Sequence, residues 1–152
     1  MTEQITIRKA SIQDIHQILN IENLSFQDDA FSKNQFLYLL KSKNSFFYVA
    51  CINNNVKGYI ILMQRKNSKS LRIYSIAVDK ESRGLNMGST MIELAVQTAN
   101  SNNFVRIHLE VNENNSAAVA LYQKHQFSVF GSFENYYKDG SKALRMKKII
   151  IS

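Results

Sequence analysis

The sequence predicts one α/β domain in which a central, mixed and mostly antiparallel sheet is flanked by helices on both faces. Three observations lead to this fold class. A chain of 152 residues suits a single hydrophobic core. Segments with the alternation of strands are interleaved with segments that carry a helical apolar stripe. Short, turn-rich connections join them without a linker or repeat, so residues 1–152 are expected to form one domain.

The expected elements can be placed from periodicity and turn signals. Ser11 and Ser32 are positioned to cap two early helices, a third helix follows Gly88, and a fourth covers 116–124. Strands are expected at 5–9, 46–52, 57–64, 71–78, 105–111, 127–137 and 143–151. The second to fourth of these strands read as an antiparallel meander. Asparagine recurs in the turns, at Asn53 and Asn54 for example, where it can adopt the left-handed backbone in place of glycine.

The charge balance favours anionic partners. Lys and Arg number 19 against 12 Asp and Glu, which gives a net charge of +7. A polyphosphate cofactor, an acidic protein or RNA would suit this balance. The basic residues are scattered rather than gathered in a block, which favours a solvated basic surface over a nucleic-acid interface.

Compartment signals point to the cytoplasm. Cys51 is the single cysteine, so no internal disulfide can form, as suits a reducing compartment. No apolar run approaches the roughly 20 residues that span a bilayer. The first residues lack the basic and apolar regions of a secretion signal. We therefore expect no membrane association.

The segment 73–93 is the most informative part of the chain. It reads as a buried strand, a turn that contains Arg83, Gly84 and Gly88, and a helix. Backbone N–H groups at the start of a helix, together with its dipole, favour an anion such as phosphate. A plain connection fits the local pattern equally well, because short glycine-bearing turns are common.

Three blocks in register resemble the GNAT family of N-acetyltransferases across almost the whole chain. The first is Ile76-Ala-Val78 with Arg83-Gly-Leu-Asn-Met-Gly88, and the second runs from Leu109-Glu-Val111 through Tyr122 to His125-Gln-Phe127. The third is Asn135-Tyr-Tyr-Lys-Asp-Gly140 with Ala143-Leu-Arg-Met146. Within the family, the chain looks most like the ribosomal-protein-alanine N-acetyltransferase branch. Two family glycines are replaced, by Asn86 in the first block and by Gln126 in the second.

The resemblance implies a GNAT fold and acetyl-CoA as co-substrate. The implied contacts to acetyl-CoA are Ile76, Ala77, Val78, Arg83, Gly84, Asn86, Met87, Gly88, Ser89, Asn115 and Tyr122. By itself, Asn115 would be read as a helix cap or turn residue. His16, His108 and His125 show no ligand spacing, and we expect no metal.

Glu110 and Tyr122 are the candidate catalytic residues. Alternation places Glu110 with Arg106 and His108 on one face of its strand, and this pattern alone favours a face open to water. The resemblance implies instead that Glu110 is the general base, directly or through a water. Helical spacing alone favours Tyr122 as a core residue, whereas the resemblance implies that its hydroxyl protonates the leaving thiolate.

The acceptor is expected to be a primary amine, acetylated by direct transfer. The resemblance favours the N-terminal amine of a protein, with Phe26, Phe31, Tyr136 and Tyr137 as walls of the acceptor site. Two alternatives stay open: acetylation of a small amine or a lysine side chain, and a non-catalytic binding module of the same fold. Cys51 lies within the apolar run 49–52, where a cysteine is usually a small core residue, and this argues against a covalent route. Both a monomer and a dimer are compatible with the sequence.

Overall fold

The computed structural model describes residues 4–150, whose seven strands form one sheet in the order β1-β2-β3-β4-β5-β7-β6. The strands are β1 Ile5–Lys9, β2 Ser45–Ile52, β3 Asn55–Gln64, β4 Ser70–Val78, β5 Arg106–Asn112, β6 Ser128–Phe133 and β7 Ala143–Ile149. β4 and β5 pair in parallel, whereas β1 with β2, β2 with β3, β5 with β7 and β6 with β7 are antiparallel. The predicted mixed, mostly antiparallel sheet is confirmed.

The helices lie close to their predicted positions. They are α1 Ile15–Phe26, α2 Lys33–Lys41, α3 Met87–Ser101 and α4 Ser116–Lys124, with short 3-10 helices at Ile12–Asp14, Gln27–Asp29 and Lys80–Ser82. Ser32 caps α2 as predicted, since its hydroxyl accepts the Gln35 amide at 3.2 Å while the Gln35 side chain accepts the Ser32 amide at 2.7 Å. Among residues 4–150, no helix is both long and apolar enough to cross a membrane.

The chain divides into two compact units. The first contains residues up to Met63 together with Tyr74–Met91, and the second contains Gln64–Ile73 and the residues from Ile92 onward. β4 and α3 each contribute to both units. The expectation of one domain is therefore kept as a proposal.

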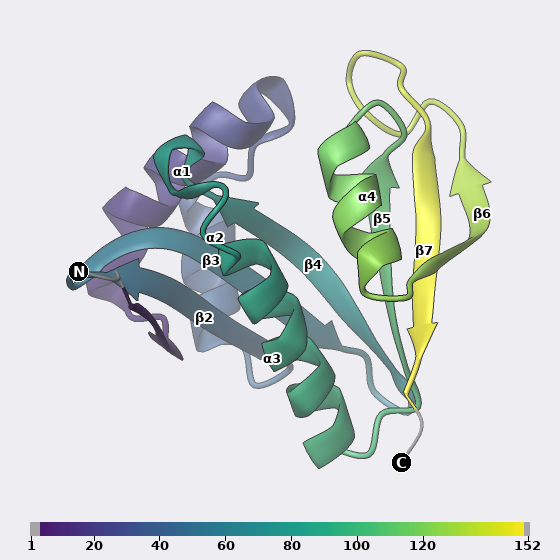
Figure 1. Cartoon of the computed structure of the whole chain (residues 1–152), viewed down its shortest axis with the longest axis horizontal. Coiled ribbons are helices and arrows are strands. Elements are labelled where there is room, and N and C mark those ends of the chain that lie inside the picture. Colours follow the sequence, from purple (N-terminus) through teal and green to yellow (C-terminus); the bar gives the residue numbers. More distant parts are fainter. Residues whose placement is uncertain (1–3, 151–152) are drawn as a thin grey trace. The chain divides into compact units, whose positions relative to one another are not determined.

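The first unit has a core built from α1, α2, β2 and β3, and the two strands lie side by side (Figure 1). Ile18, Phe36, Val49, Tyr59 and Ile61 are fully buried there. The alternation of apolar residues on the strands and their spacing on the helices produces this core.

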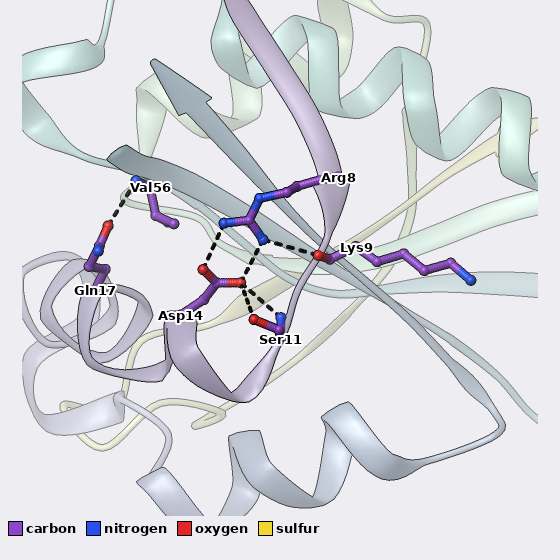
Figure 2. Close-up of polar contacts among 6 residues, drawn as sticks. All are labelled: Arg8, Lys9, Ser11, Asp14, Gln17 and Val56. Atoms are coloured by element: carbon purple, nitrogen blue, oxygen red, sulfur yellow. Dashed lines mark hydrogen bonds and ion pairs between the residues drawn. The ribbon is translucent and has the colours of Figure 1, made fainter. Parts of the chain in front are cut away.

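An ion pair joins β1 to the start of the helical segment in the first unit (Figure 2). Both guanidinium Nη atoms of Arg8 lie 2.8 Å from the carboxylate oxygens of Asp14. Ser11 donates its amide to the same carboxylate at 2.8 Å. The hydrogen bonds from Arg8 hold the pKa of Asp14 below its usual range. Gln17 accepts the Val56 amide at 2.8 Å and so ties α1 to β3.

In the second unit β7 lies between β5 and β6 (Figure 1). In β5 the odd positions are buried as predicted, at Ile107, Leu109 and Val111. Leu109 is the register partner of the fully buried Met146 on the adjacent strand β7. Val105 departs from this pattern: it precedes the strand and is 53% exposed.

The closing hairpin is shorter than predicted. β6 ends at Phe133 rather than at residue 137, and β7 ends at Ile149, while residue 151 lies outside the described residues. The reason is a compact loop in which Asn135 has φ +50° and the amides of Tyr136 and Tyr137 donate to the Ser141 carbonyl. Elsewhere asparagine does replace glycine as predicted, since Asn53 and Asn54 both have positive φ.

Candidate active site

The turn between β4 and α3 has the predicted strand–turn–helix form. After Val78 the chain passes through the 3-10 segment Lys80–Ser82 and enters the left-handed region twice, at Gly84 with φ +92° and at Asn86 with φ +62°. Left-handed backbone is the conformation that favours glycine, and asparagine tolerates it better than most residues. Asn86 therefore reproduces the backbone of the glycine that it replaces, and Arg83 is exposed at this turn.

The first turn of α3 presents backbone donors. Thr90 donates both its amide (2.9 Å) and its hydroxyl (2.8 Å) to the Asn86 carbonyl, which begins the hydrogen-bond ladder of this helix. The amides of Met87 and Gly88 precede that first rung. Together with the dipole of a 15-residue helix, they make the turn chemically suited to the pyrophosphate of a nucleotide cofactor.

Gly58 on β3 sets the position of this helix start. A Cβ at Gly58 would lie 2.9 Å from the Met87 sulfur and 3.1 Å from the Ala77 carbonyl oxygen. Met87 is 1% exposed, so its side chain packs in the core and only its backbone can face a ligand. Ala77 is also buried, whereas Ile76 and Val78 are half-buried. Sequence reasoning missed Gly58, because its role depends on contact with a distant helix.

Glu110 of β5 does not face open water. Its side chain is 8% exposed, and its Oε1 atom lies 2.6 Å from Nη2 of Arg72 on β4. This arrangement departs from the alternative of a solvated sheet face. Arg72 was missed by sequence reasoning, although its even position beside the buried Leu71 and Ile73 could have placed it on the polar face. The ion pair fixes the orientation of the Glu110 carboxylate and uses one of its two oxygens.

Tyr122 is buried in α4, with 5% exposure, and its ring contacts that of Phe127 at a centroid distance of 5.7 Å. Burial, with a smaller contribution from Tyr137, raises the pKa of the Tyr122 hydroxyl. The hydroxyl therefore keeps its proton at neutral pH, as a general acid requires. Gln126, which replaces the second family glycine, has φ +71° just after this helix.

Asn115 is the N-cap of α4, because its side-chain oxygen accepts the Ala118 amide at 3.1 Å. The cap engages this oxygen, which leaves the amide nitrogen as the donor for a ligand. The cap interpretation is confirmed, and the contact to acetyl-CoA stays a prediction.

The aromatic residues predicted for the acceptor site fall into two groups. Phe26 ends α1, and Phe31, which precedes α2, stacks on Tyr74 with a centroid distance of 4.9 Å. Phe26 and Phe31 are only partly buried against the core of the first unit. In the second unit, the exposed Tyr136 stacks on Phe133 and meets Tyr137 edge-on at 5.0 Å.

The single cysteine is buried, and the described side chains that could ligate a metal do not gather in one place. Cys51 is 3% exposed, and burial raises the pKa of its thiol, so a reactive thiolate is disfavoured. Among the described side chains, no three His, Cys, Asp or Glu residues gather as a metal site would require.

The fold and these residues define an acetyltransferase of the GNAT class. The model of the Acetyltransferase (GNAT) family matches residues 12–127, and the chain belongs to this family. It is 33% identical to an N-alpha-acetyltransferase of Saccharolobus solfataricus, over 94% of this chain and 92% of the relative. It is 30% identical to a Bacillus subtilis protein described as a putative [ribosomal protein bS18]-alanine N-acetyltransferase, over 96% of both chains. The crystal structure of Ard1 from Thermoplasma volcanium superposes with a TM-score of 0.90 at 27% identity, covering 97% of this chain and 99% of Ard1.

These relatives support the predicted branch of the family, and the chain is a GNAT N-acetyltransferase. Members of the family use acetyl-CoA. The turn at Asn86 fits that co-substrate, because its left-handed backbone keeps the shape that glycine gives and the amides of Met87 and Gly88 precede the hydrogen-bond ladder of α3.

Proposed function

We propose that this enzyme acetylates the N-terminal amine of proteins by direct transfer from acetyl-CoA. The observation that carries the proposal is the near-buried Glu110, oriented by Arg72, in the same unit as the buried, protonated hydroxyl of Tyr122. Base and acid are the two proton-handling groups that direct transfer requires. The N-alpha-acetyltransferase and Ard1 relatives support a protein N-terminus as acceptor.

Acetyl-CoA supplies the activated acetyl group as a thioester. The residues that would hold it are the backbone of Ile76, Ala77 and Val78, the charge of Arg83, the turn of Gly84 and Asn86, and the first turn of α3 with Met87, Gly88 and Ser89. Asn115 would add a donor from its side-chain nitrogen. Apart from Asn115, these residues would act through backbone groups or a permanent cation, which suit the phosphates and amides of the co-substrate.

Glu110 and Tyr122 divide the proton transfers between them. An N-terminal amine has an ordinary pKa of about 8, so only a modest pull is needed to free its lone pair. Glu110 accepts the proton of the attacking amine, directly or through a water. Tyr122 gives a proton to the leaving thiolate, and its raised pKa keeps that proton available.

The acceptor is expected to contact the four aromatic residues Phe26, Phe31, Tyr136 and Tyr137. Their partial exposure leaves ring surface for a peptide. Asn86, in place of the family glycine, is the feature that would favour a non-catalytic module, and its left-handed backbone supports the catalytic proposal instead, because it keeps the shape of the turn. We further propose that both units work as one cytoplasmic domain.

The test mixes the enzyme with acetyl-CoA and a peptide pool in which some N-termini are free and others are blocked beside free lysines. Mass spectrometry should locate acetyl groups only on free N-termini. Acetyl groups found only on lysines would contradict the proposal. So would a complete lack of peptide acetylation by an enzyme that still turns over acetyl-CoA with a small amine.

The matched variants are Glu110→Gln and Glu113→Gln, which remove the same charge. Glu113 is exposed and pairs only loosely with Lys142 at 3.8 Å. We expect Glu110→Gln to lower kcat by roughly 100-fold or more, the range of a lost general base, and Glu113→Gln to change it little. Equal rates for both variants would remove Glu110 from the mechanism.

A further inference from the structure

The sheet face that carries Glu110 is strongly basic. Residues that are Cα partners on neighbouring strands share a face. Arg72 is the partner of His108, His108 of Lys147, and Glu110 of Arg145. Arg106 lies two residues before His108 on the same face. We call this set (Arg72, Arg106, His108, Glu110, Arg145 and Lys147) the Glu110 face.

Its charges do not cancel. Four cations surround one carboxylate, and Glu110 pairs with Arg72. Among the side chains that the structure describes, no carboxylate forms an ion pair with Arg106, Arg145 or Lys147. His108 adds no charge at neutral pH, because burial lowers its pKa and its Nδ1 is bonded to the Ser70 hydroxyl. The face therefore keeps an uncompensated positive charge around one acid.

Arg145 packs against two aromatic rings and is incompletely hydrogen-bonded within the described part of the chain. Its guanidinium lies 4.7 Å from the ring centroids of both Phe130 and Phe133, which are 39% and 41% exposed. Lys147 lies 5.3 Å from the same Phe130 ring. The buried Nε atom of Arg145 has no hydrogen-bond partner among the described residues. This atom is too buried for a ligand oxygen to reach, so a carboxylate of a bound peptide would contact the terminal Nη atoms of Arg145, which pair with no carboxylate among the described side chains.

We propose that the Glu110 face selects acceptor polypeptides whose N-terminal amine is followed by acidic residues at the second or third position. This inference rests on the proposed function. The carboxylate of Glu110 would attract the N-terminal amine of the peptide, and the cationic side chains of the same face would attract carboxylates that follow it. A peptide that is positive at one end and negative a few ångströms along its chain has this same pattern.

The spacing agrees with an extended peptide. Successive residues of an extended chain are about 3.3 Å apart, and so are successive residues along β5 and β7. An amine at Glu110 would therefore place the next side chains within reach of Arg145 and Lys147, or of Arg106 along β5. A nucleic acid fits less well, because its uniform negative charge would meet the carboxylate of Glu110.

The experiment compares three peptides that begin with alanine and carry Glu-Glu, Gln-Gln or Lys-Lys at positions two and three. We expect kcat/KM for Glu-Glu to exceed that for Gln-Gln by about tenfold or more, mainly through KM, and Lys-Lys to be slowest. The advantage should shrink as ionic strength rises from about 0.05 to 0.5 M. Equal kcat/KM for all three peptides would overturn the inference while leaving N-terminal acetylation intact.

The variant Arg145→Gln should reduce the Glu-Glu to Gln-Gln ratio several-fold. Its control is Lys124→Gln, which removes the same charge from an exposed position on α4 of the same unit and should preserve the ratio. An unchanged ratio in Arg145→Gln would exclude this residue as the selector, and loss of the ratio in both variants would reduce the effect to overall charge.

Binding of the same peptides, measured by fluorescence anisotropy, separates this inference from the proposed function. If no peptide is acetylated, the proposed function fails. Tighter binding of Glu-Glu, weakened by Arg145→Gln, would still support the acidic ligand. The contrary result is that a single-stranded RNA displaces the labelled peptide more strongly than the unlabelled acidic peptide does. If Arg145→Gln also abolished that displacement, the face would be assigned to nucleic acid and the peptide proposal would be overturned.

Discussion

The guanidinium of Arg72 lies 2.6 Å from the carboxylate of Glu110, and the two residues belong to neighbouring parallel strands. The pair fixes a side chain that would otherwise be free to change rotamer on the sheet face. A catalytic base has to be held within hydrogen-bond reach of the proton that it takes. We therefore propose that Arg72 is a positioning residue for Glu110.

Replacing Arg72 by Met should therefore lower kcat by roughly tenfold or more, through misplacement of Glu110. Arg72 is about one-third exposed, so we expect a loss of only about 1–2 kcal/mol in the free energy of unfolding. Arg72→Lys keeps the charge and should restore part of kcat. Steady-state kinetics and denaturant unfolding on the three proteins test this. A large loss of stability with unchanged kcat would reduce Arg72 to a structural role.

Tyr122→Phe removes a hydroxyl from a buried ring and keeps its packing against Phe127. If the hydroxyl protonates the leaving thiolate, kcat should fall by roughly 100-fold while the melting temperature changes little. Because burial raises the pKa of Tyr122, the wild-type rate should show no decline from this group up to about pH 10. Tyr38→Phe, at a 69% exposed position on α2, is the control. Equal kcat in Tyr122→Phe and wild type would assign Tyr122 to the core alone.

The left-handed backbone of Asn86 predicts how this position tolerates substitution. Asn86→Gly should retain the acetyl-CoA affinity, and Asn86→Ala should lose about 1 kcal/mol of stability and bind acetyl-CoA more weakly. Gln126→Gly, at φ +71°, should stabilise the protein by about 1 kcal/mol without changing that affinity. Calorimetric titration and thermal unfolding measure both quantities. Tighter acetyl-CoA binding by Asn86→Ala would contradict a requirement for left-handed backbone.

The contrast between Asn86 and Arg72 shows what the sequence could predict. Asn86 lies within a local motif, so its backbone follows from the turn and from the known tolerance of asparagine. Helix α4 and strand β1 were likewise placed correctly, because each has a clear local period or cap. Arg72 acquires its role only when β4 pairs with β5, and no local pattern specifies that pairing. The end of β6 at Phe133 was missed since the aromatic run through Tyr137 resembles a strand until the loop hydrogen bonds are known.

The buried Glu22 of α1 should give this enzyme an unusual dependence of stability on pH. Glu22 is 0% exposed, accepts the Phe31 amide at 2.9 Å and accepts the hydroxyl of Tyr59, which also contacts the Ser75 hydroxyl at 3.1 Å. Burial raises its pKa to about 7 from an ordinary value of 4.5, and the Phe31 amide opposes that rise. Between these values the native state keeps a proton that the unfolded chain has already released. The contribution of Glu22 to stability therefore falls as pH increases from about 4.5 to 7 and is level on either side.

Glu22→Gln removes this titration, so the difference in unfolding free energy between wild type and the variant should fall by roughly 3 kcal/mol across that window. His108 and His125, whose pKa values are lowered by burial, act in the opposite direction, but they are common to both proteins and cancel in the difference. Urea unfolding at pH 5, 6, 7 and 8 (about one pKa unit per step) measures the slope. Parallel pH profiles for the two proteins would show that Glu22 ionises normally in the fold. If the unfolding free energy of the wild type falls relative to that of the variant as pH rises, the Glu22 carboxyl is neutral at and below pH 6. It then anchors Phe31 as part of a hydrogen-bonded chain through Tyr59 to Ser75.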